Sequence, residues 1–338
     1  MFCRQVKYAL LTYEPTHGTY NLGDYVQSLA ARQYLPRVDR LLNRERLNAY
    51  DGPEAKIILN GWFTHRPETW VPSPRLHPLF VSFHVNLSAA SRMLNPAGVE
   101  YLRKHAPIGC RDQQTVECLL RHGIEARFTG CLTLTLSAFR NQQALRRHIY
   151  LVDPLVNFPL LRDLLLSPKR LLLALRTGEW RHLGRRARVL PKIVSPTLVA
   201  TARIRNHVLP SARITDDGKF ALAESYLREY ADARLVVTSR IHCALPCLAM
   251  GVPVIFINAF DDPVENCRFG GILELLNRVD LGPDGRVSNN FGLTGLIDGE
   301  HVPENPSRHL SMAADLQCAC KAFIAGPSEN LNRNPNPG

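Results

Sequence analysis

Short apolar runs alternate with helix-like stretches along both halves of this 338-residue chain. In the first half, apolar runs cover residues 8–12, 56–59, 79–83 and 108–110, and helical patterns cover 25–34 and 113–122. In the second half, apolar runs cover 149–152, 235–237 and 253–257, and helical patterns cover 221–231 and 243–250. Strands that alternate with helices form mostly parallel sheets with both faces covered. The pattern therefore predicts an α/β fold.

The length of the chain is comfortable for two domains. We expect an N-terminal α/β domain over residues 1–139 and a C-terminal α/β domain over 140–325. The Asn-, Pro- and Gly-rich tail at 326–338 is expected to be disordered.

No apolar run reaches the roughly 18 residues that span a bilayer, and the first residues lack a signal-peptide pattern. We therefore expect a cytoplasmic protein.

The net charge of +11 comes from one part of the chain. Between residues 140 and 213 there are fifteen Lys/Arg and three acidic residues, and a basic Leu/Arg-rich segment lies at about 160–213. Its core, residues 164–188, mixes leucine runs, arginine pairs and Trp180. Three interpretations stay open: a solvated or interdomain hairpin, a patch for peripheral contact with the inner membrane face, and a nucleic-acid surface. No nucleic-acid motif accompanies the segment, so we expect no nucleic-acid partner.

Polar side chains stand where several of the apolar runs stop. In open α/β sheets, ligands bind beyond the carboxyl ends of the strands. This rule selects as substrate-binding or catalytic candidates Asn21, Gly23, Asp24, Asn60, His84, Arg111, Ser239, Arg240 and His242. The loop at 18–24 also fits an ordinary turn in which Asp24 caps the following helix, His84 fits a plain strand-end histidine, and Arg111 with Asp112 fits an exposed ion pair.

Arg240 and His242 stand at the most informative junction, between an apolar strand and a small-residue helix. The N-terminus of a helix has unsatisfied backbone N–H groups and favours anions. Arginine offers a planar fork that matches phosphate or carboxylate, and histidine exchanges a proton near neutral pH. The alternative is structural: Arg240 paired with an aspartate and His242 satisfied by the backbone.

Three stretches of the chain, in this order, resemble the polysaccharide pyruvyl transferase family. They are Asn21-Leu22-Gly23-Asp24; Arg111-Asp112 through Gly130-Cys131-Leu132-Thr133; and Val237-Thr238-Ser239-Arg240-Ile241-His242 through Gly251-Val252-Pro253. The resemblance spans about residues 8–258. It implies two Rossmann-like domains facing a cleft, as in the GT-B glycosyltransferases. By position, Arg240 and His242 match the family's active-site Arg-x-His, with His84 and Arg111 as further matches.

The resemblance implies transfer of the pyruvyl group of phosphoenolpyruvate onto a sugar, which leaves a pyruvate ketal and releases phosphate. Phosphoenolpyruvate is then a co-substrate, and no cofactor or metal is required. Arg240 and Arg111 suit its two anionic groups. His242 is the candidate general acid, and His84 the candidate base or substrate-orienting group. The nine cysteines form no zinc-ligand pattern, which also predicts no metal site.

The expected acceptor is a saccharide of a surface-polysaccharide precursor, and whether a lipid carries it stays open. Two other functions also stay open. One is a nucleotide-sugar-dependent glycosyltransferase on the same fold. The other is a non-catalytic glycan- or anion-binding protein, for which a protonatable histidine beside the arginine would be unnecessary.

Overall fold

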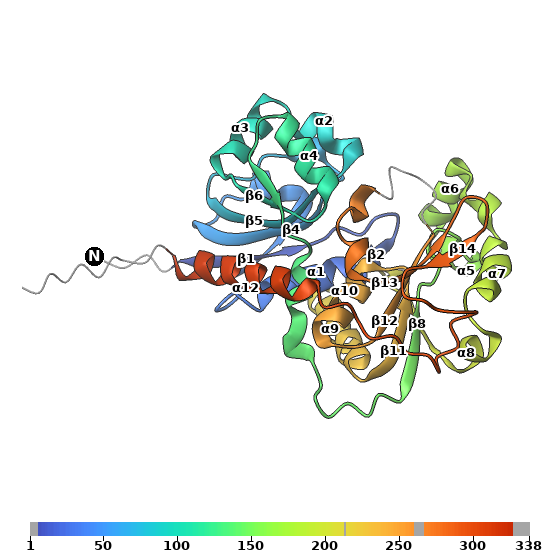
Figure 1. Ribbon diagram of the computed structural model, residues 1–338. Helices are drawn as coiled ribbons and strands as arrows, with labels where there is room; N and C mark the ends of the chain where they lie inside the picture. Colours follow the sequence, from blue (N-terminus) through green and yellow to red (C-terminus); the bar gives the residue numbers. More distant parts are fainter. Residues whose placement is uncertain (1–5, 213, 260–266, 327–338) are drawn as a thin grey trace, which may run out of the picture.

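The computed structural model describes residues 6–212, 214–259 and 267–326. Within these residues, two six-stranded sheets organise the chain (Figure 1). The expected disordered tail lies, from residue 327 onward, outside the described residues. The predicted α/β class, with mostly parallel sheets flanked by helices, is confirmed.

The first sheet is parallel throughout. In spatial order its strands are β3 (Arg40–Asn43), β1 (Lys7–Thr12), β4 (Ala55–Phe63), β5 (Leu76–Val85), β6 (Ile108–Cys110) and β7 (Ala126–Phe128). Successive residues of a strand point to opposite faces of the sheet. Ile57, Ile58 and Leu59 of β4 are all buried, so both faces of this sheet are covered.

The second sheet has the order β14-β13-β12-β11-β8-β9. Its strands are β14 (Val287–Asn289), β13 (Asn277–Leu281), β12 (Val254–Asn258), β11 (Ala233–Thr238), β8 (His148–Val152) and β9 (Arg203–Arg205). All its pairs are parallel except β13 with β14. The central strand β11 is buried from Leu235 to Val237, as its continuous apolar run predicts.

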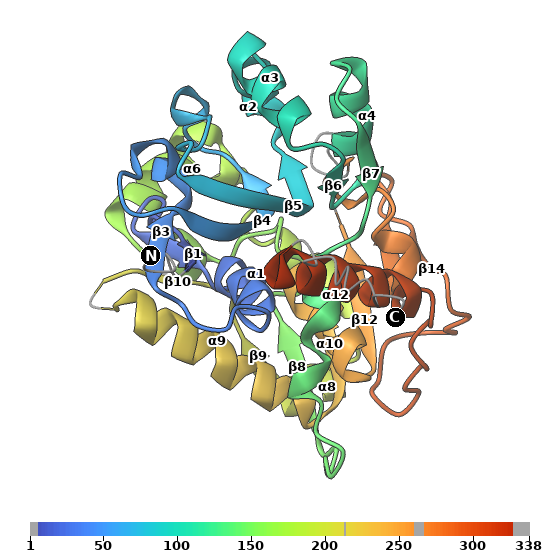
Figure 2. The ribbon, with the colours of Figure 1, turned by 90° about the vertical axis from the view of Figure 1, so that its left-hand side faces the viewer.

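Helices cover these sheets (Figure 2). They are α1 (Leu22–Arg32), α2 (Leu87–Met93), α3 (Pro96–Lys104), α4 (Gln113–Arg121), α5 (Leu161–Leu164), α6 (Pro168–Thr177), α7 (Arg185–Val189), α8 (Pro196–Thr201), α9 (Asp216–Ala231), α10 (Ile241–Met250) and α12 (His309–Ala325). Short 3-10 helices include η1 (Arg44–Ala49), η3 (Leu132–Phe139) and η4 (Glu179–His182).

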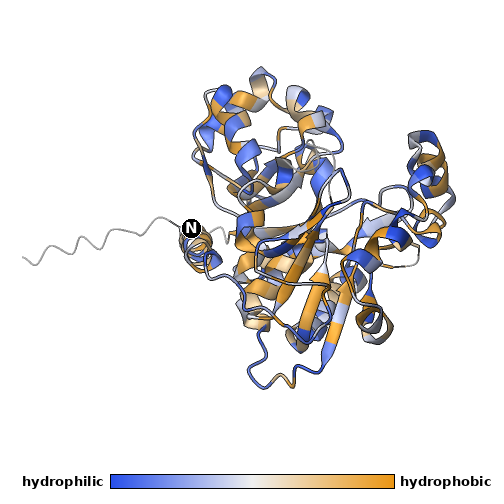
Figure 3. Cartoon of the chain, turned by 45° about the vertical axis from the view of Figure 1, so that its right-hand side comes forward, coloured by the Kyte–Doolittle hydropathy of each residue, from blue (hydrophilic) through white to orange (hydrophobic). Residues whose placement is uncertain are grey.

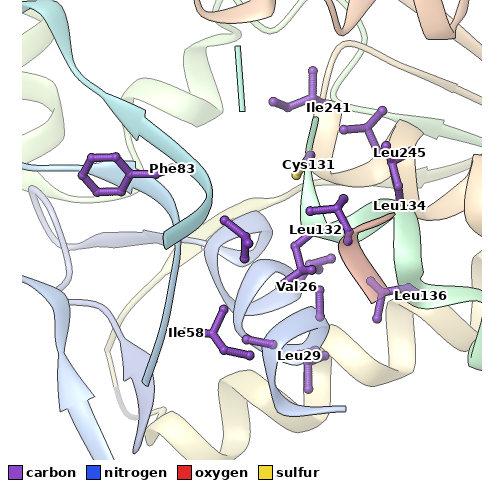
Figure 4. Close-up of a cluster of buried hydrophobic side chains, with 14 of the residues drawn as sticks. Val26, Leu29, Ile58, Phe83, Cys131, Leu132, Leu134, Leu136, Ile241 and Leu245 are labelled. Atoms are coloured by element: carbon purple, nitrogen blue, oxygen red, sulfur yellow. The ribbon is translucent and has the colours of Figure 1, made fainter. Parts of the chain in front are cut away.

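The two halves share a large hydrophobic core, and a smaller cluster of buried residues lies within the second half. Figure 4 shows part of the shared core, where Val26 and Leu29 of α1 lie near Leu132 and Leu134 of η3 and Leu245 of α10. This packing holds α1, from the first half, against α10, from the second. A small antiparallel pair, β2 (Thr19–Asn21) with β10 (Val208–Pro210), also joins the halves. Helix α12 returns from the end of the chain to the first sheet, where the Lys56 Nζ donates to the Phe323 carbonyl at 2.7 Å.

Two strands run further than the sequence pattern predicts. We expected Asn60 and His84 just beyond strand ends, but they lie inside β4 and β5. The Asn-Gly pair resembles a stop signal, yet Gly61 has φ +95° at an irregularity of the ladder. Pairing resumes after it and continues to Phe63 and Val85. Glycine absorbs the positive φ at little cost, so the pair marks a bulge and not a turn.

The first helix begins earlier than predicted. Asp24 was expected to cap a helix starting at residue 25, but the cap is Asn21, whose side chain accepts from the Gly23 N–H at 3.1 Å. The Leu22 N–H, a further donor of the first turn, is bound by the His207 carbonyl. Asp24 therefore lies inside the first turn, where its charge suits the helix dipole.

Among the described residues, none of the helices is both long and apolar enough to cross a membrane.

Candidate functional site

A cavity of about 540 Å³ lies where the two halves meet. Its walls include seven of the residues selected from the sequence: Asn21, Gly23, Asp24, Arg111, Ser239, Arg240 and His242. The fold brings these residues together from the N-terminus of α1, the end of β6 and the junction between β11 and α10. Asn60 and His84 are not part of the cavity wall.

The junction after β11 positions Ser239, Arg240 and His242. Strand β11 ends at Thr238, and Arg240 is the N-cap residue of α10. The Ser239 hydroxyl donates to the Ile257 carbonyl at 2.7 Å and accepts from the Leu155 N–H at 2.9 Å. Ser239 therefore ties this junction to strand β12 and to the loop after β8, and it fixes the start of α10.

Arg240 has a carboxylate partner at the cavity. Its Nε donates to Asp153 Oδ2 at 2.8 Å, and the same oxygen accepts from the His207 N–H at 2.9 Å. Burial raises the pKa of Asp153, but the guanidinium of Arg240 and the His207 N–H outweigh it and hold the pKa below its usual value. The ion pair that the structural alternative required is thus present. It orients the guanidinium while leaving Arg240 on the cavity wall.

His242 is buried, and the backbone does not satisfy its ring nitrogen Nε2. Within the described part of the chain, His242 Nε2 has no hydrogen-bond partner. Burial lowers the pKa of His242 well below 6.5, and the positive charge of Arg111 lowers it further. The ring is therefore neutral near pH 7 in the ligand-free cavity. A buried polar atom without a partner is costly, which points to a ligand or solvent at Nε2.

Arg111 is held from behind by a buried carboxylate and a histidine. Its Nε lies 3.8 Å from Asp112 Oδ2, and the same oxygen lies 2.6 Å from His84 Nδ1. Asp112 also caps α4 by accepting from the Thr115 N–H at 2.9 Å. Burial, followed by the charge of Arg111, lowers the pKa of His84 to about 4. A neutral His84 thus orients Asp112, which in turn faces Arg111.

Asp24 adds a carboxylate to a cavity rich in arginine. Its Oδ1 accepts from Gln27 Nε2 at 3.2 Å. Burial raises the pKa of Asp24, and the guanidinium groups of Arg44, Arg111 and Arg240 offset part of the rise. A buried carboxyl with a raised pKa can exchange a proton closer to neutral pH than an exposed one.

Asn60 serves α1. Its Nδ2 donates to the Gln27 carbonyl at 2.9 Å, behind the residues that line the cavity. This contact joins β4 to the helix that carries Asn21 and Asp24.

Several cavity residues were missed by the sequence reasoning. They are Glu14, Arg44, Trp62, His65, His207 and Arg268. Arg44 is buried and lies over the rings of Tyr13 and Trp62, at 5.0 and 4.9 Å from their centroids. It also pairs with buried Glu45 at 2.7 Å. Arg44 directly follows β3, a position that would have marked it as a candidate. The strand sequence, Arg-Leu-Leu-Asn, has no clear apolar pattern, so the strand was not predicted.

The arrangement suits a multiply charged anion and a proton transfer. Arg44, Arg111 and Arg240 supply cationic forks from three different elements, and His242 and Asp24 supply groups that can carry a proton. Within the described residues, no group of three or more His, Cys, Asp or Glu side chains could hold a metal ion.

Comparison with known proteins identifies the chain's relatives at the level of the family. The family model described as polysaccharide pyruvyl transferase matches residues 21–259. This range contains all seven of the cavity residues that were selected from the sequence. A search of curated proteins found no match.

Proposed function

The chain belongs to the polysaccharide pyruvyl transferase family, and we propose that it transfers the pyruvyl group of phosphoenolpyruvate to a saccharide as a ketal. The observation that carries this proposal is the convergence of Arg111, Arg240 and His242 on one cavity. The family implies a polysaccharide acceptor. In the proposal this acceptor is a precursor of a surface polysaccharide, met in the cytoplasm, and the two sheets form a GT-B-like pair.

Arginine chemistry supports the choice of donor. Phosphoenolpyruvate carries a phosphate and a carboxylate, and guanidinium groups bind both in bidentate fashion. Arg240 binds one of these groups beside the N-terminus of α10, where backbone N–H groups also favour an anion. Arg111 binds the other. Arg44 provides a third positive charge for the anion or for the departing phosphate.

In the proposed reaction, His242 Nε2 delivers a proton to C3 of phosphoenolpyruvate. The π electrons of the C2–C3 double bond form the new C–H bond at C3, and C2 becomes electrophilic. One sugar hydroxyl adds to C2 and gives its proton to Asp24, which passes it to the departing phosphate. A second hydroxyl then displaces that phosphate, returns its proton to the deprotonated His242 and closes the ketal ring. Correctly placed proton transfer is worth about 10²–10⁴ in rate.

His84 and Asp24 take different parts in this scheme. His84 lies outside the cavity wall, so we assign it the orienting role, exerted through Asp112 on Arg111. Asp24 lies on the wall, and its carboxylate is the proposed acceptor of a hydroxyl proton. Its raised pKa improves that role, because a base is most effective when its pKa is near the working pH.

Phosphate release tests the proposal. The protein is incubated with phosphoenolpyruvate and a panel of free and lipid-linked oligosaccharides, and phosphate is measured with and without each acceptor. We expect acceptor-dependent release that disappears in Arg240→Ala and His242→Ala proteins that remain folded.

A thermal-shift comparison with nucleotide sugars separates the glycosyltransferase alternative, which predicts stabilisation by those compounds alone. Binding of phosphoenolpyruvate without turnover on any acceptor would favour a non-catalytic binding protein.

A further inference from the structure

Exposed leucines are concentrated in the segment that runs from α5 to α7. Leu161, Leu165, Leu172 and Leu175 are 55–68% exposed, and Trp180 is 46% exposed. Isolated exposed apolar residues are ordinary on a protein surface, but a contiguous group of them marks an interaction site. We call the surface formed by these five residues together with Lys169, Arg176 and Arg181 the Leu/Arg surface.

The helix at the centre of this surface is firmly built. Ser167 caps α6 by accepting from the Arg170 N–H at 3.1 Å, and Gly178 ends it with φ +77°. Arg170 also binds Glu179 in a two-pronged contact, with one distance of 2.6 Å. Yet Ala174 is the one residue of α6 that is fully buried. The helix therefore holds its shape while keeping two leucines and two cations on its exposed side.

Charge surrounds these leucines. Residues 161–192 contain nine Lys/Arg and two acidic residues. Both acids have partners within the segment: Glu179 pairs with Arg170, and Asp163 lies 3.6 Å from Arg162. Lys169, Arg176 and Arg181 are exposed and can meet an external anionic partner. Figure 3 shows the result as hydrophobic and hydrophilic residues mixed along the helices at the right-hand side of the molecule.

The N-terminus of α6, beside the Leu/Arg surface, adjoins residues of the cavity wall. The Ser167 hydroxyl donates to the His17 carbonyl. A Cβ added to Gly18 would lie 2.9 Å from the Ser167 side chain. Thr16 and Thr19, on either side of this contact, both line the cavity. A partner that binds α6 would therefore lie near this part of the cavity wall.

We propose that the Leu/Arg surface binds an anionic lipid bilayer. Leucine and tryptophan side chains enter the boundary between headgroups and acyl chains, while lysine and arginine bind the anionic headgroups. A nucleic acid would match the cations but would leave the exposed leucines without a partner. Docking here brings the cavity wall next to α6 close to the membrane surface. If the proposed transferase activity holds, a lipid-carried sugar could then reach the cavity from the bilayer.

Vesicle co-sedimentation of the full chain tests this proposal without relying on enzymatic activity. The probes are phosphatidylglycerol-containing vesicles and pure phosphatidylcholine vesicles, each at low and high salt. We expect binding to the anionic vesicles that weakens as salt screens the charges. Lys169→Gln/Arg176→Gln should weaken the partition about 25-fold, because each basic residue contributes about fivefold. Leu172→Gln/Leu175→Gln should weaken it roughly tenfold or more through the loss of apolar contact.

Matched substitutions elsewhere keep the test specific. Leu145→Gln/Leu310→Gln removes two leucines that are exposed outside the segment, and Arg121→Gln/Arg127→Gln removes two exposed cations. Circular dichroism confirms that each variant is folded, and neither control pair should change sedimentation. The proposal is overturned if the protein prefers neither vesicle, if the controls weaken binding as much as the Leu/Arg variants, or if duplex DNA displaces it from the vesicles.

Discussion

Gly23 and His242 are in contact across the junction of the two halves. A Cβ built on Gly23 would lie 3.1 Å from both Cβ and Nδ1 of His242. The Asn21 Oδ1, which caps α1, would be 3.2 Å away. The glycine thus leaves room for the imidazole ring, and the start of α1 fixes where that ring can lie.

Replacing Gly23 by alanine is expected to displace His242. The helix itself tolerates alanine well, so the fold should persist while the ring moves. A misplacement of about 1 Å at a reacting group can cost on the order of 10²-fold in rate, and we expect a fall in kcat/KM of that order. Steady-state phosphate release measures it. Gly218→Ala, also in the first turn of a helix but with an Ile214 side chain as its near neighbour, is the matched control. Equal activity in the two variants would show that the contact does not position His242.

Asp153 is expected to position Arg240. Asp153→Asn keeps the shape of the side chain but removes the charge that faces Arg240 Nε at 2.8 Å. The freed guanidinium should hold its anion less well, and the KM for phosphoenolpyruvate should rise roughly tenfold, as expected for loss of a partly buried charge partner. Asp163→Asn, which removes a carboxylate outside the cavity wall, is the control. An unchanged KM in Asp153→Asn would remove Asp153 from the site.

The sequence indicated the main junctions of the site because those junctions depend on local patterns. Arg240 and His242 follow a continuous apolar strand and begin a helix, and the structure places both on the cavity wall. Asp153 follows a strand in the same way, but its importance depends on strand order. Only the pairing of β8 with β11, which sets Val152 beside Thr238, brings Asp153 next to Arg240.

Other features depended on tertiary contacts that no local pattern carries. Arg44 reaches the cavity because β3 pairs with β1 at the edge of the first sheet, and the strand is too polar to be recognised alone. His84 was expected just beyond the end of its strand, but the strand continues to Val85 in register with β4. Its partner Asp112 lies 28 residues away in sequence.

His84 should make the protein less stable as the pH falls. The unfolded chain binds a proton at His84 near pH 6.5, whereas the folded protein binds it only near pH 4. The folded-state pKa is depressed, so this stability is present above pH 6.5 and is lost between pH 6.5 and 4. The loss from this one group is about 1.4 kcal/mol per pH unit inside that window.

Urea unfolding at several pH values measures this effect. In His84→Asn, the free energy of unfolding should fall less steeply between pH 6.5 and 4 than in the parent protein. His148→Asn, which removes an exposed histidine at the start of β8, should leave the parent slope unchanged. Parallel curves for His84→Asn and the parent would contradict a neutral, buried His84.

Binding of phosphoenolpyruvate should draw a proton into the cavity. In the free protein, burial and the neighbouring arginines keep His242 neutral, with a pKa well below 6.5. An anion beside Nε2 favours the imidazolium form, so the pKa should rise and the ring should take up a proton at pH 7. The ligand changes the number of bound protons in the opposite direction. Its phosphate has a second pKa near 6, and binding to arginine can only favour proton release from it.

Calorimetric titrations in buffers of different ionisation enthalpy count these protons. We expect net uptake of between zero and one proton per site at pH 7, lost in His242→Gln and retained in Asp24→Asn. Asp24 is the informative comparison because its carboxyl also shares the cavity with Arg44, Arg111 and Arg240. Uptake that survives in His242→Gln but disappears in Asp24→Asn would assign the donated proton to Asp24. Equal net proton exchange in the parent protein and in His242→Gln would leave His242 neutral in the complex and unable to protonate C3.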